Sequence, residues 1–249
     1  MSDLWRGASE ASRRFGAQAL DYDRYRPGYP EGVFDDILEI ADASAGADVI
    51  EIGAGTGIAT EPLVQRGLSV TAIEPSPEMA SVARAKLNDR ASIFVGRFED
   101  YPATDPVALV SSFNAWHWVD PAVAVSRAAE LLAPGGSLAL VWTEVVSWGE
   151  EPFEELLAEV SGYPWVKRLN HVDDSMQPIR RDPRFEDARV LHHVFERTLD
   201  AATFVAVTKT YGGTRTDEQY DAIARVINDE LGGSITKVED AALYILRRH

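Results

Sequence analysis

The sequence has no cysteine, few basic residues and no long apolar run. Without cysteine, the chain has no disulfide and no thiolate for metal binding or nucleophilic catalysis. Its 24 lysines and arginines stand against 40 acidic residues, which gives a formal net charge of -16. A nucleic-acid backbone would be repelled by this charge, so we expect no nucleic-acid partner. No segment approaches the roughly 18 apolar residues that a membrane span requires, so we expect no membrane partner.

Residues 1–16 mix charges throughout and have no apolar core of signal-peptide length. We therefore expect a cytoplasmic protein. The 249 residues, 45% of them hydrophobic, suffice for one α/β domain with a sizeable core. Helices are expected over residues 9–25 and after Pro30.

Short apolar runs alternate with helical stretches between Asp48 and Trp142. This alternation is typical of a parallel sheet covered by helices on both faces. The expected strands are DVIEI, SVTAIE, SIFVG, VALVSS and SLALVW, with helices ending at 65 and spanning 77–87 and 121–132. Farther on, we expect helices near 150–160, 201–210 and 217–231, strands near 189–199 and 241–246, and no regular structure over 162–187.

The stretch VIEIGAGTG places three glycines at alternate positions directly after an apolar strand. A dinucleotide-binding loop needs a small residue where this chain has Ile58, and a phosphate-binding P-loop needs a Lys-Ser or Lys-Thr pair that is missing. The loop therefore predicts close approach of the backbone to a ligand without a pyrophosphate. Glu74 ends the second strand, where a carboxylate can accept hydrogen bonds from both ribose hydroxyls, although nicotinamide enzymes also place one there.

The segments VIEIGAGTG and AIEPSPEM resemble the first two motifs of class I S-adenosylmethionine-dependent methyltransferases. GRFEDYP, LVSSFNAWHWVDP and LLAPGGSLALVW resemble the motifs that follow them, and FGAQALDYDRYRPGYP resembles the segment that covers the cofactor in small-molecule members of the methyltransferase type 11 and trans-aconitate methyltransferase-like groups. The resemblance implies a doubly wound, Rossmann-like α/β fold. Its seven-stranded sheet would be mostly parallel with an antiparallel last strand and helices on both faces.

The same resemblance implies a single domain over residues 1–249. Its parts would be an N-terminal cofactor cover (1–30), a cofactor-binding half (48–142), a substrate cap (144–187) and C-terminal strands and helices (188–249). The implied reaction moves a methyl group from S-adenosylmethionine to a small-molecule acceptor by in-line displacement and leaves S-adenosylhomocysteine. Such a reaction depends mainly on holding the reactants in line.

Two alternatives remain open. An NAD-dependent oxidoreductase is disfavoured by Ile58 and by the lack of an obvious Tyr-x-x-x-Lys motif. A non-catalytic S-adenosylmethionine-binding protein would keep the same loop. In every case we expect a monomer or homodimer.

The resemblance implies a role for each motif residue. The glycines would bring backbone against the methionine part of the cofactor, with Glu51 near its ammonium group. Glu74 would hold the ribose, and Met79 and Phe98 would flank the adenine. The implied cofactor-binding residues are Tyr22, Arg26, Glu51, Gly53, Gly55, Gly57, Glu74, Met79, Phe98 and Asn114.

His117 is the candidate general base, because it follows the fourth strand at the carboxyl end of the sheet, where open α/β folds bind ligands. Alternatively, it donates to a backbone carbonyl in the pocket wall. Tryptophan side chains would form the acceptor pocket, although such aromatics also serve in packing. The candidate substrate-binding residues are Trp116, Trp118, Trp142, Trp148 and Trp165. No metal site is expected.

Overall fold

The computed structural model describes residues 15–102, 105–148, 153–155, 159, 170–211 and 215–249. The strands are β1 (Asp48–Ile52), β2 (Ser69–Glu74), β3 (Ser92–Val95), β4 (Val107–Phe113), β5 (Leu132–Ser147), β6 (Arg189–Asp200) and β7 (Ser234–Arg247). The helices are α2 (Ala19–Tyr25), α3 (Glu31–Ala41), α4 (Thr60–Gln65), α5 (Pro77–Leu87), α6 (Pro121–Leu131), α8 (Asn170–Arg180), α9 (Ala201–Thr210) and α10 (Asp217–Asp229). Short 3-10 turns include η2 (Phe98–Asp100) and η3 (Trp116–Trp118).

The strands form one seven-stranded sheet in the order β3-β2-β1-β4-β5-β7-β6. β7 runs antiparallel to both β5 and β6, whereas the pairs from β3 to β5 are parallel. This arrangement confirms the predicted Rossmann-like α/β fold with an antiparallel last strand. No helix in the described part of the chain is long and apolar enough to cross a membrane.

Local sequence signals set the ends of two helices beside the sheet. The Ser76 side chain accepts from the amide of Met79 at the start of α5. Asp120 accepts from the amide of Ala122 at the start of α6, and Pro121 occupies the first helical position, where its missing N–H costs nothing. Both helices therefore begin where the sequence indicates.

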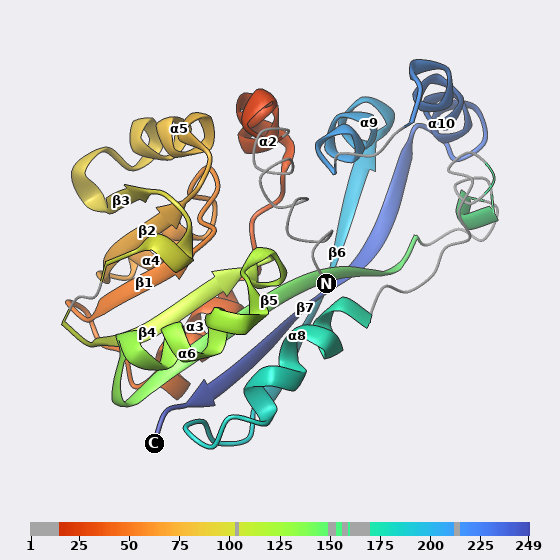
Figure 1. Ribbon diagram of the computed structural model, residues 1–249. Coiled ribbons are helices and arrows are strands. Elements are labelled where there is room, and N and C mark those ends of the chain that lie inside the picture. Colours follow the sequence, from red (N-terminus) through yellow and green to blue (C-terminus); the bar gives the residue numbers. More distant parts are fainter. Residues whose placement is uncertain (1–14, 103–104, 149–152, 156–158, 160–169, 212–214) are drawn as a thin grey trace.

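Helices cover both faces of the sheet (Figure 1). α6 and α8 pack on one face over a core that includes Ile50, Val110 and Leu140. α3 and α4 pack on the other face, where Phe34 and Ile37 meet residues of β1, β4, β5 and β7. The inner strands β1, β2, β4 and β5 thus bury side chains on both sides, which explains why they contain continuous apolar runs.

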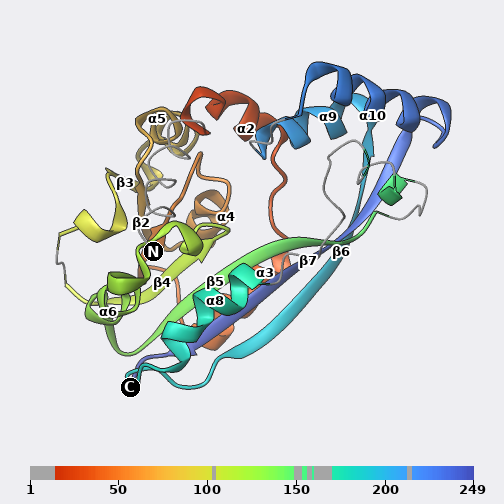
Figure 2. The same ribbon diagram turned by 45° about the vertical axis from the view of Figure 1, so that its right-hand side comes forward.

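β5, β6 and β7 are longer than the other strands and continue beyond them as a three-stranded arm (Figures 1 and 2). α9 and α10 lie at the end of this arm. They enclose a small separate core that contains Trp148, Phe153, Phe204, Ile223 and Ile227. The last strand accordingly begins at Ser234, well before the predicted start near 241.

The segment 162–187 was expected to be irregular, and this prediction is wrong for α8. The helix buries Val172, Met176 and Ile179 against the face that carries α6. Pro178 near the end of the helix and the surrounding charges obscure this stripe in the sequence. The described end of the predicted substrate cap therefore covers the sheet. Most of the helix expected over 150–160 lies outside the described residues.

The N-terminal helix α2 lies between α5 and α9 and contacts both (Figure 1). Lys86 of α5 forms an ion pair with Asp23 of α2. On the other side, Arg26 follows α2 and donates from Nε to the Thr210 hydroxyl at the end of α9, at 2.9 Å. α2 therefore bridges the parallel half of the sheet and the arm.

Candidate functional site

A cavity of about 1050 Å³ lies at the carboxyl ends of β1, β2 and β4, beneath α2. Its wall also includes residues of β5 and β7 and of the end of α9. The cavity brings together nine of the ten predicted cofactor-binding residues, namely Tyr22, Arg26, Glu51, Gly53, Gly55, Glu74, Met79, Phe98 and Asn114. The tenth, Gly57, is buried beside the wall. Residues that are far apart in the sequence thus form one site.

The three loop glycines all adopt left-handed backbone conformations, with φ of 69° at Gly53, 58° at Gly55 and 81° at Gly57. L-residues with a side chain rarely adopt these values. At Gly53 there is no room either, because an added Cβ would overlap the Cβ of Ala115 after β4. The loop is therefore shaped to present backbone to the cavity.

Glu74 holds this loop in place from the end of β2. Its Oε2 accepts from the amide of Gly55 at 2.8 Å, and its Oε1 accepts from the amide of Ser76 at 2.7 Å. Burial raises the pKa of the Glu74 carboxyl, and the two amide bonds oppose this rise. Each carboxylate oxygen can accept a second hydrogen bond. Glu74 can thus organise the loop and still accept from a ligand hydroxyl.

Glu51 is a buried acidic residue in the cavity wall. It is 1% exposed, and its Oε2 has no hydrogen-bond partner in the described part of the chain. Burial raises the pKa of Glu51 to about 8, the nearby Thr60 hydroxyl lowers it, and the charge of Glu74 raises it. A buried carboxylate of this kind is stabilised by a cation. The site therefore fits the ammonium group that the family resemblance assigns to it.

Asn114 shapes the cavity where β4 ends. Its φ of 53° is unusual for a residue with a side chain. Its Oδ1 accepts from the amide of Thr143 on β5 at 2.8 Å, and its Nδ2 donates to the Tyr29 hydroxyl at 3.0 Å. Burial raises the pKa of Tyr29, so the phenol stays protonated. The Asn114 amide thus joins three segments of the wall, and sequence reasoning missed Tyr29 and Thr143.

Arg26 closes the cavity from above. Its Nη2 donates to the Thr210 carbonyl at 3.2 Å, and its guanidinium lies 4.0 Å from the ring centre of Tyr211 and 4.9 Å from that of Tyr22. These contacts tie the cover to the arm. Thr210 and Tyr211 follow the loop by more than 150 residues, and no local pattern marks them as parts of the site.

Met79 and Phe98 also line the cavity. The Met79 Cε lies 3.4 Å from the position that a Cβ on Gly55 would occupy. Phe98 is 3% exposed, and its ring lies 6.4 Å from that of Trp116. Arg97 beside it forms an exposed ion pair with Asp100 at 3.0 Å. Both apolar residues are placed where they can flank a flat ring.

His117 lies in the wall on η3, and its imidazole contacts the buried Trp142. Trp142 donates from Nε1 to His117 Nδ1 at 3.4 Å. This contact orients the imidazole in the wall. The role of His117 as a general base stays a prediction.

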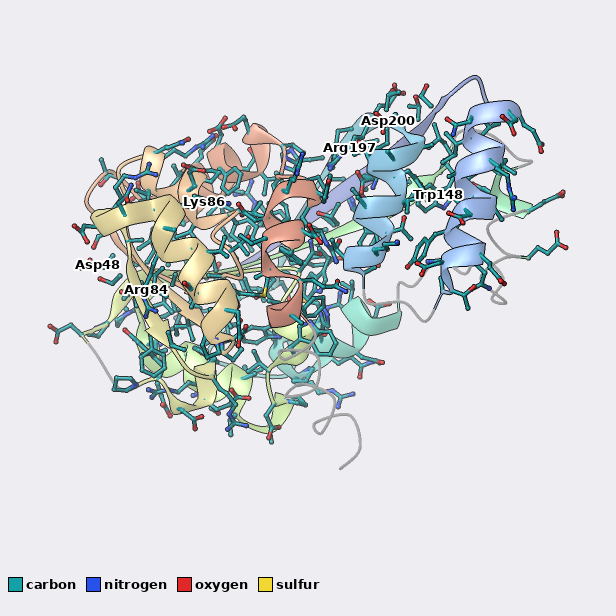
Figure 3. The ribbon with its side chains drawn as sticks, turned by 90° about the horizontal axis from the view of Figure 1, so that it is seen from above. Asp48, Arg84, Lys86, Trp148, Arg197 and Asp200 are labelled. Carbon is teal, nitrogen blue, oxygen red and sulfur yellow. The ribbon has the colours of Figure 1, made fainter. Side chains whose placement is uncertain are left out.

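The tryptophans divide between the wall and the core. Trp118 lines the cavity and is 39% exposed. Trp116, Trp142 and Trp148 are buried in hydrophobic clusters and do not line it. Trp148 lies beside α9 and α10, on the opposite side of α2 from α5 (Figure 3). The structure thus gives these three a packing role in place of the predicted acceptor contacts. Trp165 lies outside the described residues.

No group of three or more histidine, aspartate or glutamate side chains in the described ranges is arranged to hold a metal ion.

Comparison with known proteins places the chain in a family. The family described as methyltransferase domain matches residues 50–140. An uncharacterized methyltransferase of Mycobacterium tuberculosis is 42% identical over 146 residues, which cover 57% of this chain and 58% of that protein, so the match spans little more than half of either. An uncharacterized methyltransferase of Geobacillus kaustophilus is 34% identical over 155 residues, which cover 58% of this chain and 71% of that protein.

The fold has solved counterparts. The structure of an S-adenosylmethionine-dependent methyltransferase from Thiobacillus denitrificans in complex with S-adenosylhomocysteine has a TM-score of 0.52 and 13% identity, and the match covers 90% of this chain and 94% of that one. The Rossmann-like sheet with a glycine loop at its carboxyl edge places the chain in the general class of Rossmann-like α/β proteins. The chain belongs to the methyltransferase family, which confirms the resemblance of its motifs.

Proposed function

We propose that the chain binds S-adenosylmethionine in this cavity and transfers its methyl group to a small-molecule acceptor. The observation that carries this proposal is the buried Glu51 carboxyl, whose Oε2 has no hydrogen-bond partner in the described residues, beside a glycine loop whose Gly55 amide donates to Glu74. The fold counterpart from Thiobacillus denitrificans, solved with S-adenosylhomocysteine, supports the choice of cofactor.

The residues of the wall fit the parts of this cofactor in order. Glu51 would hold the ammonium group, Glu74 the ribose hydroxyls, and Phe98 and Met79 the adenine. When bound, S-adenosylmethionine supplies a methyl group on a positively charged sulfur, which an acceptor can attack directly.

The protein contributes to the reaction mainly by positioning the two reactants and by enclosing them in the cavity. Arg26 and Tyr22 cover the cavity and limit access of water. Trp118 presents an aromatic side chain, whose face can attract a cation by roughly 0.5–2 kcal/mol. Holding an acceptor in line can supply roughly 7–11 kcal/mol of the barrier, so the reaction needs no catalytic triad.

Calorimetric titration with S-adenosylmethionine, S-adenosylhomocysteine and NAD tests the proposal. We expect binding of the two adenosyl ligands only, and its loss in Gly55→Val and Glu74→Ala. The exposed Glu218→Gln on α10 is the matched control and should bind normally. Binding of NAD would favour an oxidoreductase. Adenosyl binding without methyl transfer to any small molecule in a labelled-methyl screen would favour a non-catalytic binding protein.

The cytoplasmic location, the monomeric or homodimeric state and the substrate cap over 144–187 stay predictions from the sequence.

A further inference from the structure

Three charged side chains lie close together where the arm forms one end of the cavity. Lys237 and Glu239 of β7 are 1% and 2% exposed. Lys237 Nζ donates to Glu239 Oε1 at 2.8 Å, and Arg197 Nε of β6 lies 3.1 Å from Glu239 Oε2. We refer to Arg197, Lys237 and Glu239 as the Glu239 cluster. Of the three, Glu239 lines the cavity.

One oxygen of Glu239 remains available. Oε2 has no hydrogen-bond partner in the described ranges, because the Arg197 N–H is not aligned with it. A carboxylate oxygen that is buried in a cavity wall and accepts no hydrogen bond is ready to accept one from a ligand.

The backbone pairing of β6 and β7 does not depend on these side chains. β6 and β7 already pair continuously from Arg189 opposite Ile245 to Asp200 opposite Ser234. Removing several charges from water is costly, and replacing buried ion pairs by apolar residues is often neutral or stabilising. A buried charge cluster at a cavity wall therefore points to a ligand.

The register of the strands places Glu239 next to the methionine end of the proposed cofactor site. Thr143, held by Asn114, pairs with Ala241, and Val145 pairs with Glu239. Glu239 thus lies on the same face as Thr143 and two residues farther along, which is about 7 Å in a strand. A small molecule that contacts Glu239 would lie within reach of a methyl group held beside Asn114.

The surrounding wall indicates the kind of molecule. Tyr29, Phe113 and Tyr211 also line the cavity and offer apolar, aromatic surface. The Glu239 cluster has a net positive charge, which disfavours an ammonium group, and the Glu239 carboxylate in the cavity wall is negative, which disfavours a ligand carboxylate. An uncharged O–H donor satisfies both conditions.

We propose that Glu239 binds the methyl acceptor, and that this acceptor is an uncharged aromatic molecule whose hydroxyl donates to Glu239 Oε2. Lys237 and Arg197 are positioning residues that hold the carboxylate. The proposal rests on the proposed function, since it concerns the second substrate of the same cavity.

The test uses the whole protein saturated with S-adenosylhomocysteine and four small probes: phenol, anisole, benzoate and benzylammonium. Calorimetry should show that phenol binds most tightly. Glu239→Gln and Glu239→Asp should weaken phenol binding by about tenfold or more, the loss typical of a hydrogen bond to a charged group. Anisole, which has no O–H, should change little in either variant. The exposed Glu218→Gln should leave phenol binding unchanged.

Glu239→Asp keeps the negative charge opposite Lys237 and Arg197. It therefore still tests the proposal if Glu239→Gln fails to fold. S-adenosylhomocysteine affinity in each variant shows that the site is intact. Phenol that fails to bind, binds equally without Glu239, or binds less tightly than a charged probe overturns the inference while leaving the proposed function standing. Wild-type protein that does not bind S-adenosylhomocysteine overturns both.

Discussion

Replacing Glu51 with glutamine should make the free protein more stable at neutral to basic pH and, at the same time, a weaker binder of S-adenosylmethionine. Glu51 is fully buried, and its burial raises the pKa from 4.5 to about 8. The folded protein therefore holds a proton that the unfolded chain releases between these two values. Stability falls as pH rises through this window, because the folded state must either keep the proton or bury a charge.

The pKa values set the size of the effect. The shift from 4.5 to about 8 corresponds to roughly 5 kcal/mol of unfolding free energy, which is present in full below pH 4.5 and lost by about pH 8. The amide of the glutamine variant does not ionise, so Glu51→Gln should not show this loss. Its advantage over the wild type should grow with pH to several kcal/mol.

Ligand binding should respond in the opposite direction. The proposed ammonium partner needs the ionised form of Glu51, and binding must therefore release its proton. With a free-state pKa of about 8, wild-type affinity should rise about 20-fold between about pH 6 and about pH 7.5. Glu51→Gln should bind more weakly and lose most of this dependence.

Urea unfolding and calorimetry at a series of pH values measure both effects. The exposed Glu218→Gln is the control, and titration of all other groups cancels in the difference between variant and wild type. The reasoning fails if Glu51→Gln and wild type have parallel stability curves between pH 5 and pH 8, or if the variant binds S-adenosylmethionine as tightly as the wild type.

Three further predictions concern the loop, the cover and the arm. Gly53→Ala combines a positive φ with an overlap at Ala115, so thermal unfolding should show a loss of roughly 2 kcal/mol or more; an unchanged melting temperature would contradict the loop geometry. Arg26→Ala removes the bonds to Thr210, so S-adenosylmethionine should dissociate faster and bind about tenfold more weakly, as stopped-flow measurements can show; an unchanged dissociation rate would exclude a closing role. Trp148→Ala leaves a cavity in the arm and should cost roughly 3–5 kcal/mol of stability in urea unfolding. If the Trp148→Ala protein is stable but inactive, the packing role is wrong and the predicted contact between Trp148 and the acceptor is correct.

Local signals allowed much of the fold and the cofactor site to be predicted. The apolar runs mark strands because both faces of the sheet are covered. Asp120 and Pro121 mark a helix start because the Asp120 side chain caps the first turn and Pro121 occupies the first helical position. The spacing of Gly53, Gly55 and Gly57 reflects a conformation that only glycine adopts readily, so the loop is visible in the sequence.

The acceptor end could not be predicted, because it depends on strand register and on contacts between distant segments. Glu239 enters the wall only because β7 pairs with β5 in the observed register, and a shift by one residue would turn it to the other face. Tyr211 enters through the bridge between α2 and α9. The cluster of tryptophans after β4 and β5 suggested a pocket, but composition does not show which face a side chain occupies. Trp142 faces the core beside Tyr244, at 5.6 Å between ring centres.

A crystal structure of the protein grown with S-adenosylhomocysteine would test the central claim most directly. The account predicts the ligand in the cavity beneath α2, with its ammonium group within hydrogen-bond distance of Glu51, its ribose hydroxyls at Glu74 and its adenine beside Phe98. A ligand bound outside this cavity, or one whose amino-acid end lies away from Glu51, would contradict it.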